Sequence, residues 1–230
     1  MAAPETVIWM RPEHAKAGRP AERSRALVTA AAIAVADRDG LGAVSMRRVA
    51  AELGTGAASL YRYVATRDDL LDLMADCTGA EYALAAPSGN WLADLLDVAR
   101  QARAIMLRHP WLPALVITRA TLGPRGVDLV EHVLNVLRDH PAEPPAKLEA
   151  FGILMAMTAT FVQHEAAADQ AAQQRQAAYL HHVATAGQHP RLAALLGTAQ
   201  PSSDPAVQFE TILTRILAGL LATTPQAATP

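Results

Sequence analysis

Apolar residues recur every three or four positions along most of this chain, which is the periodicity of amphipathic helices. Between residues 21 and 39, Leu27, Ala31, Ala34 and Val35 follow that spacing. We find no sustained alternation of apolar and polar residues and no paired turn signals, so the pattern predicts no β-strand. The fold is therefore expected to be all-α.

Residues 45–64 predict two short helices joined by a turn that contains glycine. Ser45 is of the type that caps a helix N-terminus, and Gly54 suits the tight turn between the helices. Apolar positions on both helices then point to one small core: Met46, Val49, Ala50, Leu53, Leu60 and Val64. This layout is that of a helix-turn-helix, whose second helix enters the major groove of DNA.

The second helix and its surroundings carry side chains suited to DNA contact. Small side chains allow the backbone to approach the groove, while hydroxyl groups and arginines bind phosphates or guanine edges. The candidate DNA-binding residues are Ser45, Arg47, Arg48, Ala57, Ala58, Ser59, Tyr61, Arg62, Tyr63 and Arg67. Singly, each tyrosine fits ordinary packing and each arginine a solvated face; the whole set favours DNA.

Further helices are expected beyond this motif. Thr66 can cap a helix that connects the motif to the rest of the chain, with acidic residues in its first turn. Glycines and prolines interrupt the later part of the chain at intervals and separate its helices. The pattern predicts helices over residues 67–85, 91–108 and 124–139, an irregular segment over 111–121, and a partly mobile segment over 166–204.

Two later segments, 146–166 and 205–222, have apolar stripes and small residues that allow close helix approach. Two such helices from each of two subunits would form a four-helix bundle. The candidate dimer-interface residues are Leu148, Phe151, Met155, Ala159, Val162, Phe209, Leu213, Ile216 and Leu220. The alternative is that these stripes are buried only against their own chain.

Charge is distributed unevenly along the 230 residues, whose net charge is −2. Through Arg67 there are 10 Lys and Arg against 6 Asp and Glu, a net charge of +4, and the remainder carries −6. A basic N-terminal part on an acidic body is expected when only one end meets phosphate.

Cysteine usage and hydropathy indicate a cytoplasmic protein. Cys77 is the only cysteine, so no intrachain disulfide can form. We see no apolar region typical of a secretory signal and no run of about 18 apolar residues, so no membrane-spanning helix is expected.

The motifs resemble those of the tetracycline-repressor (TetR) family of transcription regulators. Over residues 23–84 the similarity is carried by Leu41 to Ala50, Leu53-Gly54, Ser59 to Val64 and Asp69-Leu70-Leu71; a weaker similarity over 91–222 is carried by Arg108 to Leu112 and Leu122-Gly123-Pro124. By motif, Arg47, Ser59, Tyr61, Tyr63 and Arg67 occupy the family's DNA-contact positions. Ala57, Ala58 and Arg62 depart from the tetracycline repressor itself, and its tetracycline-contacting polar residues are not cleanly matched.

This resemblance implies a ligand-responsive homodimer on a palindromic double-stranded DNA operator. The expected organisation is an N-terminal arm over 1–20, a helix-turn-helix domain over 21–66, an effector-binding and dimerisation domain over 67–222, and a tail over 223–230. We expect a repressor that a small, largely apolar effector releases, without cofactor or metal. The candidate ligand-binding residues are Met106, Trp111, Met155 and Phe161.

An enzyme is not expected. His164-Glu165 lacks the second histidine of a zinc-protease helix, Cys77 has no nearby candidate base, and no glycine-rich phosphate loop is present. The remaining alternative is a helical small-molecule-binding or scaffolding protein that does not bind DNA.

Overall fold

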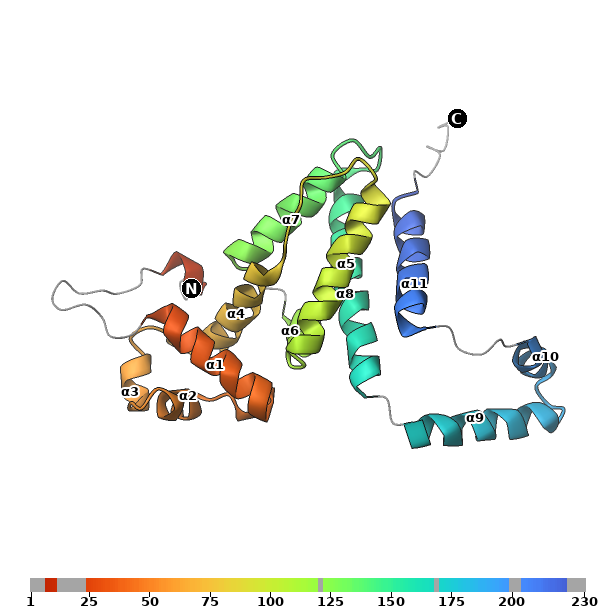
Figure 1. Ribbon diagram of the computed structural model, residues 1–230, viewed down its shortest axis with the longest axis horizontal. Helices are drawn as coiled ribbons and strands as arrows, with labels where there is room; N and C mark the ends of the chain where they lie inside the picture. Colours follow the sequence, from red (N-terminus) through yellow and green to blue (C-terminus); the bar gives the residue numbers. More distant parts are fainter. Residues whose placement is uncertain (1–6, 12–23, 120–121, 168–169, 199–203, 223–230) are drawn as a thin grey trace, which may run out of the picture.

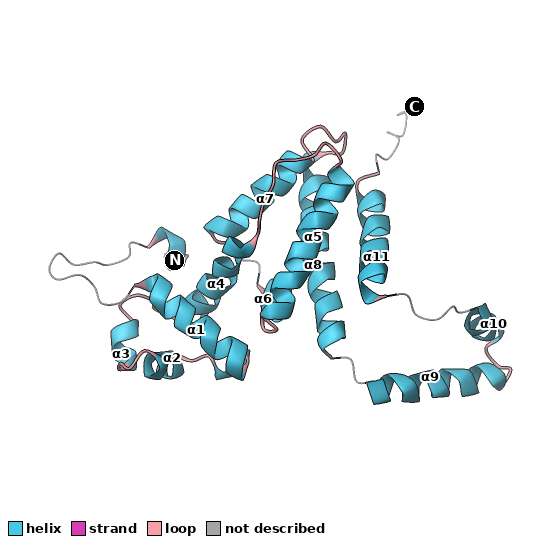
Figure 2. Cartoon of the chain, in the orientation of Figure 1, coloured by secondary structure: helices cyan, strands magenta, loops and turns pink. Residues whose placement is uncertain are grey.

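The computed structural model describes residues 7–11, 24–119, 122–167, 170–198 and 204–222, and these form helices and loops without a strand (Figure 2). The predicted all-α class is confirmed over this part of the chain. In chain order the elements are η1 (Ile8–Met10), α1 (Arg25–Asp39), η2 (Leu41–Ala43), α2 (Met46–Glu52), α3 (Ala57–Leu60), α4 (Arg67–Thr78), η3 (Gly79–Glu81), α5 (Trp91–Arg108), α6 (Leu112–Thr118), α7 (Pro124–Val136), α8 (Pro144–Ala166), α9 (Gln170–Thr185), α10 (Pro190–Thr198) and α11 (Pro205–Leu220).

Helices α1 to α3 form a compact head at one end of the molecule (Figure 1). The Ser45 hydroxyl accepts a hydrogen bond from the Arg48 backbone N–H, so the expected cap of α2 is present. Gly54 has a φ of 61°, the left-handed conformation that the turn requires. In α1, Ala31 and Val35 are buried as expected, but Leu27 and Ala34 are exposed, and the buried face is completed by Val28, Ala32 and Ala36.

Helix α4 leads from the head into the body. Thr66 and Asp69 form the expected capping box at its start. The helix ends at Thr78 rather than near residue 85, where the sequence pattern placed its end. At Gly79 a Cβ atom would collide with the Cβ of Arg125, so the first turn of α7 packs closely against the end of α4.

The body is built from α5, α6, α7, α8 and α11, with α8 packed against each of the other four (Figure 1). Residues 111–121, predicted to be irregular, contain helix α6, whose Leu112 and Leu115 are buried. Pro113 stands in the first turn of this helix, where a missing backbone N–H is tolerated. A proline at this position is compatible with the start of a helix, but the pattern of apolar residues over 111–121 is too short to predict one.

Helix α8 bears on the expectation that no segment could cross a membrane. By length and composition alone, Pro144–Ala166 is apolar enough to do so. Its apolar character has a different cause in this fold, because one face of the helix is buried: Ala150, Phe151, Leu154, Thr158, Ala159 and Val162. Core helices commonly pass such a hydropathy test.

The predicted dimer-interface stripe is largely interior. Phe151, Ala159, Val162, Phe209 and Leu213 are at most 8% exposed within the single chain, so they have almost no surface left for a partner. For these five residues the prediction is corrected, and the alternative of burial against their own chain holds. Leu148, Met155, Ile216 and Leu220 keep exposed or partly exposed surface, so their interface role stays a prediction.

Two segments that were predicted to be mobile contain helical turns among the described residues. Within 166–204, α9 and α10 form a helical pair that projects away from the body, separated near Gly187 (Figure 1). Within the predicted N-terminal arm, Ile8 is 2% exposed. The rest of that arm, at 1–6 and 12–20, and the predicted tail at 223–230 lie outside the described residues.

Candidate DNA-binding surface and ligand cavity

The candidate recognition helix is the short helix α3 and the turn over residues 61–63 that follows it. Leu60 and Val64 are fully buried and fix this segment to the core of the head. Tyr61, which lies between them, is 54% exposed, and Ala58 and Arg62 are also exposed. The segment therefore presents a small residue, an aromatic hydroxyl and a positive charge to solvent.

Several predicted contact residues are already engaged within the head. The Ser59 hydroxyl donates to the Gly56 carbonyl at 2.8 Å and lies 2.9 Å from the Thr55 hydroxyl. The Arg62 guanidinium lies over the half-buried Tyr63 ring, 5.8 Å from its centre. These contacts hold the short helix in shape, which reduces the entropy lost when a partner is bound.

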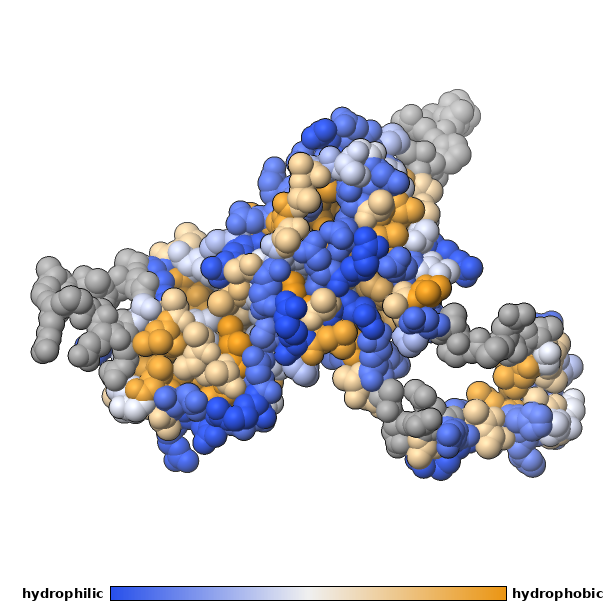
Figure 3. Space-filling view, in the orientation of Figure 1, coloured by the Kyte–Doolittle hydropathy of each residue, from blue (hydrophilic) through white to orange (hydrophobic). Residues whose placement is uncertain are grey.

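Arginines and acids gather along the edge of the head formed by α2 and the end of α1 (Figure 3). Arg48 lies 2.9 Å from Asp39, and hydrogen bonds from Arg38 and Arg48 lower the pKa of the Asp39 carboxyl. Arg47, in contrast, is exposed and makes no hydrogen bond or ion pair with any other described residue. Among the charged residues of α2, Arg47 is the one most available to a phosphate.

Arg67, the first residue of α4, makes its hydrogen bonds within the head. Its Nε donates to the Val44 carbonyl at 2.8 Å and its Nη2 donates to the Leu41 carbonyl at 3.2 Å. The side chain thus ties the start of α4 to the loop before α2. Its predicted contact with DNA stays a prediction.

The head and the body share one hydrophobic core. This core runs from Val28 and Val49 in the head through Met74 of α4 to Trp111 and Leu112 in the body. At its edge, the Trp111 indole N–H donates to Asp37 on α1 at 2.6 Å. Because a close-packed core transmits strain, a displacement of α4 or α6 in the body should also displace residues of the head.

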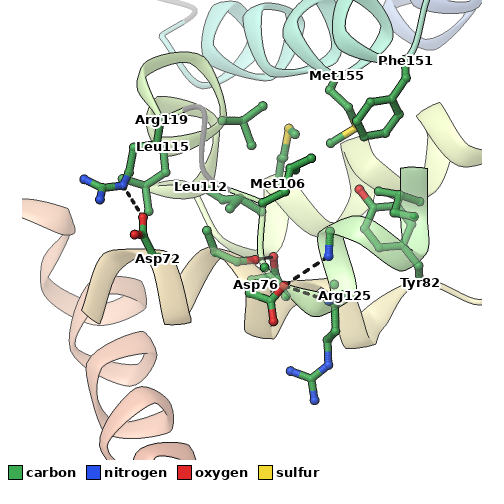
Figure 4. Close-up of a pocket in the computed structure, with 18 of the residues that line it drawn as sticks. Asp72, Asp76, Tyr82, Met106, Leu112, Leu115, Arg119, Arg125, Phe151 and Met155 are labelled. Atoms are coloured by element: carbon green, nitrogen blue, oxygen red, sulfur yellow. Dashed lines mark hydrogen bonds and ion pairs between the residues drawn. The ribbon is translucent and has the colours of Figure 1, made fainter. Parts of the chain in front are cut away.

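A cavity of about 290 Å³ lies in the body beside α4 (Figure 4). Helices α4, α5, α6, α7 and α8 all contribute to its wall. Its apolar lining includes Met106, Leu112, Leu115, Val116, Leu129, Phe151 and Met155. Such a concave, mainly apolar site with a few polar groups is typical of small-molecule binding.

The polar groups of the cavity are concentrated on α4 and opposite it (Figure 4). The Arg119 Nε donates to Asp72 at 2.7 Å, and its Nη1 donates to Asp68 at 3.0 Å. The hydrogen bond to Asp72 raises the pKa of Arg119, while burial opposes this shift. Asp76 accepts hydrogen bonds from the backbone N–H groups of Arg125 and Gly126 at 2.9 and 3.1 Å, so α4 caps the N-terminus of α7.

Tyr82 adds a hydroxyl group that forms no hydrogen bond with another described residue. Its ring lies in the cavity wall near Phe151, and burial raises the pKa of its phenol (Figure 4). Among the described residues, no hydrogen bond reaches the Tyr82 hydroxyl. A neutral phenol in this position can donate to, or accept from, a ligand.

Two parts of the chain match models of known protein families. Residues 28–74 match the model described as bacterial regulatory proteins of the tetR family, and residues 85–224 match the tetracyclin repressor-like C-terminal domain. The chain belongs to the TetR family. The resemblance expected from the sequence motifs is thereby confirmed.

Curated relatives of this TetR-family chain are regulators. It is 44% identical over 125 residues to the HTH-type transcriptional repressor DrrR1 of Streptomyces coeruleorubidus. The aligned residues make up 54% of this chain and 46% of that relative. It is 37% identical over 131 residues to an HTH-type transcriptional regulator of Saccharopolyspora erythraea, 56% of this chain and 55% of the relative. The matches thus span about half the length of these relatives.

Solved structures of TetR-family proteins match over more of the chain. ActR of Streptomyces coelicolor in complex with (S)-DNPA is 32% identical, with a TM-score of 0.76, over 89% of this chain and all of that one. ActR in complex with actinorhodin is also 32% identical, with a TM-score of 0.77, over 91% of this chain and all of that one. Both of these ActR structures hold a small molecule.

Of the four predicted ligand-binding residues in this TetR-family fold, two line the cavity and two lie outside it. Met106 and Met155 line the cavity. Trp111 does not, because its indole is turned to Asp37 at the head–body junction, and Phe161 packs edge-to-face on Phe209. Those two assignments are corrected.

Sequence reasoning missed the polar part of the cavity. The missed lining residues with polar side chains are Asp72, Asp76, Thr78, Tyr82, Arg119 and Arg125. The two α4 carboxylates are one helical turn apart, which places them on the same face of a helix. The spacing of Asp72 and Asp76 was the one sequence signal for this polar wall. Two carboxylates on a solvent-exposed helix face have the same spacing, so the signal does not identify a cavity.

Proposed function

We propose that this chain is a sequence-specific DNA-binding transcriptional repressor that acts in the cytoplasm and is released from a palindromic operator by a small, largely apolar effector. One observation carries the proposal: the helix that leads out of the helix-turn-helix forms a wall of the ligand cavity. Asp72 and Asp76 of α4 line that cavity, while Arg67 of α4 holds the loop before α2. A ligand in the cavity and DNA at the head would thus both act on helix α4.

The exposed surface of the head supports DNA as the partner. Ala58, Tyr61 and Arg62 on the α3 segment, together with Arg47 on α2, offer a small surface, a hydroxyl and two charges. In helix-turn-helix proteins, base edges are contacted by the N-terminal residues of the second helix, and phosphates by flanking residues. Assigning DNA contact to these residues, and to the other predicted ones, is part of the proposal.

A homodimer is part of the proposal because a single α3 segment is short. Two copies held about 34 Å apart would double the contacts and read a two-fold site. Helix α8 offers small and apolar side chains outside the cavity for such a pairing, and α11 offers others: Ile153, Met157, Thr160, Val207, Thr211 and Ala218. Small residues allow helices of two subunits to approach closely and form a four-helix bundle.

The cavity indicates the chemistry of the effector. Its walls favour a mainly apolar molecule, while the Tyr82 hydroxyl and the Arg119–Asp72 pair favour a few oxygen-bearing groups at one side. (S)-DNPA and actinorhodin, which ActR holds in its solved structures, are therefore the first compounds to test.

Release would follow from preferential ligand binding to a DNA-incompetent state. A ligand that enters beside α4 competes with Asp72 for Arg119 or presses on Asp76, and either change alters the tilt of α4. To move the population from 1:99 to 99:1, the ligand must favour the released state by about 5.5 kcal/mol. A ligand with equal affinity for both states would release nothing.

A fluorescence anisotropy experiment tests this function. The full chain is titrated onto labelled DNA from the region upstream of its own gene, with a scrambled fragment of equal length as the control. We expect tight binding to the first fragment only, weakened by added salt and by (S)-DNPA or actinorhodin. Equal binding to both fragments would refute sequence-specific recognition; ligand binding without any DNA binding would favour a helical small-molecule-binding protein.

A further inference from the structure

The N-terminal segment, residues 7–11, joins the ligand cavity to the head by a second route that does not run along α4. Within it, Ile8 is 2% exposed and forms part of η1, which lies near the first turn of α7 (Figure 1). The segment precedes the helix-turn-helix in sequence but is packed in the fold.

One end of the segment touches the wall of the cavity. Gly123 lines the cavity and is the N-cap residue of α7. A Cβ atom at Gly123 would collide with both the Asp76 carboxylate and the Trp9 indole. Trp9, Asp76 and Gly123 therefore meet at one tightly packed point, where α4 and α7 also join.

The other end of the segment is tied to the recognition helix through Arg25 of α1. Arg25 Nη1 donates to the Ile8 carbonyl at 3.3 Å and to the Arg11 carbonyl at 2.9 Å. Its Nε donates to the carbonyl of Tyr63, at the end of the α3 segment, at 3.0 Å. One guanidinium thus connects the N-terminal segment to the residues that present Tyr61.

Arg11 also contacts the start of α4. Its Nη1 lies 2.8 Å from Asp69 Oδ2, and that oxygen accepts a hydrogen bond from the Thr66 backbone at 3.1 Å. The Asp69 side chain is only 9% exposed, so this ion pair is shielded from solvent on the acidic side. Movement of the segment therefore changes the cap of α4 as well as the environment of Arg25.

We propose that Trp9 and Arg11 are positioning residues that carry occupancy of the cavity to the recognition helix through Arg25. A ligand that displaces Gly123 moves Trp9, the segment shifts, and the hydrogen bonds of Arg25 realign Tyr63. Coupling of this kind needs a contiguous path of packed groups, and the contacts from Gly123 through Trp9 and Arg25 to Tyr63 form such a path. The inference rests on the proposed function, because it assigns residues that regulate the same site.

The first test needs no ligand. Hydrogen exchange of the backbone amides of residues 57–64 is measured in Trp9→Ala and Arg11→Ala, with Trp9→Phe and Arg11→Lys as conservative variants. Trp91→Ala and Arg138→Ala are matched controls on the body, far along the chain from the head. We expect exchange at 57–64 to become at least about fivefold faster in both alanine variants, to recover in the conservative ones, and to stay unchanged in the controls.

A substitution inside the cavity wall replaces the ligand in the second test. Gly123→Ala places a methyl group against Trp9 and Asp76, so it should speed exchange at 57–64 and weaken operator binding. In a Trp9→Ala background part of that effect should be lost, which gives a non-additive double-mutant cycle. Circular dichroism of each variant confirms that it is folded before it is compared.

The outcomes separate this inference from the proposed function. If the wild-type chain fails to bind any operator, the proposed function fails, but the exchange data still show whether the N-terminal segment restrains residues 57–64. If the wild-type chain binds its operator while Trp9→Ala and Arg11→Ala leave exchange at 57–64 unchanged, the inference is overturned. Additive effects of Gly123→Ala and Trp9→Ala would also overturn it.

Discussion

His109 Nδ1 lies 2.7 Å from Asp37 Oδ1, and this contact joins the end of α5 to helix α1 of the head. The other ring nitrogen of His109 lies 2.8 Å from Glu81 Oε1. The pair of Arg108 with Glu81 adds an ion pair beside these two contacts. The head–body junction is therefore held by a cluster of polar side chains from α1, η3 and the end of α5.

Replacing Asp37 should loosen this junction. In Asp37→Ala the indole N–H of Trp111, which is 4% exposed, loses its acceptor. An unsatisfied buried donor costs about 1–3 kcal/mol, and we expect the free energy of unfolding to fall by that amount. Urea denaturation measures it, with Asp128→Ala, which changes an exposed aspartate on α7, as the control; an equal loss in the two variants would contradict this account.

Stability should depend on pH through Glu81. Burial by itself raises the pKa of this carboxyl, but hydrogen bonds from Arg108 and His109 outweigh burial and hold the pKa below its ordinary value. A lowered folded-state pKa means that the stabilisation is complete above the unfolded value, about 4.3, and is lost as pH falls through the folded value.

We therefore expect the urea midpoint of the wild-type chain to fall more steeply than that of Glu81→Gln as pH is lowered from about 5 to about 3. Glu149→Gln, which changes an exposed glutamate on α8, should keep the wild-type slope. Parallel curves for the wild-type chain and Glu81→Gln would show that the cluster does not stabilise the fold.

The helix-turn-helix could be predicted from the sequence because its signals are local. Ser45 and Thr66 cap helices through backbone groups three residues away, and Gly54 is needed wherever the turn demands a positive φ. None of these depends on what packs against the head. Its position, helix order and buried anchors were accordingly predictable.

The cavity and the interface could not be predicted in the same way, because an apolar stripe does not say what covers it. Phe151 fits equally a dimer contact, a core position and a cavity wall, and only the packing of α7 against α8 decides. Asp76 and Tyr82 gain their roles from residues about 50 and 70 positions further along the chain. No local pattern encodes such contacts.

Tyr61 and Arg47 should be needed for operator binding but not for folding. We expect Tyr61→Ala and Arg47→Ala each to weaken operator affinity about tenfold, and Arg47→Ala also to reduce the slope of log affinity against log salt by about 1. Tyr179→Ala is the matched control, since that tyrosine is 61% exposed on α9. Unchanged affinity in either head variant would remove that residue from the contact surface.

A charge on the outer face of α8 should separate the proposed dimer. Ile153 is 39% exposed, so Ile153→Arg leaves the core of the single chain intact while burying a charge in any α8-mediated interface. Sedimentation velocity should show monomers, and operator affinity should fall with the loss of the second head. Ile117→Arg alters an isoleucine on α6 that is 48% exposed and should stay dimeric; dimers in both variants would place the interface elsewhere.

Removing the Tyr82 hydroxyl should affect ligand binding alone. Because no described residue forms a hydrogen bond with that hydroxyl, Tyr82→Phe leaves no protein group unsatisfied. The melting temperature should therefore be unchanged or slightly higher. Burial raises the pKa of the phenol, so the group stays neutral and can donate to a ligand oxygen at physiological pH. For an effector with such an oxygen, calorimetry should show an affinity about five- to tenfold lower, roughly the worth of one hydrogen bond, with operator affinity unchanged. Tyr179→Phe serves as the control, and a lower melting temperature in Tyr82→Phe would mean that the hydroxyl stabilises the protein itself.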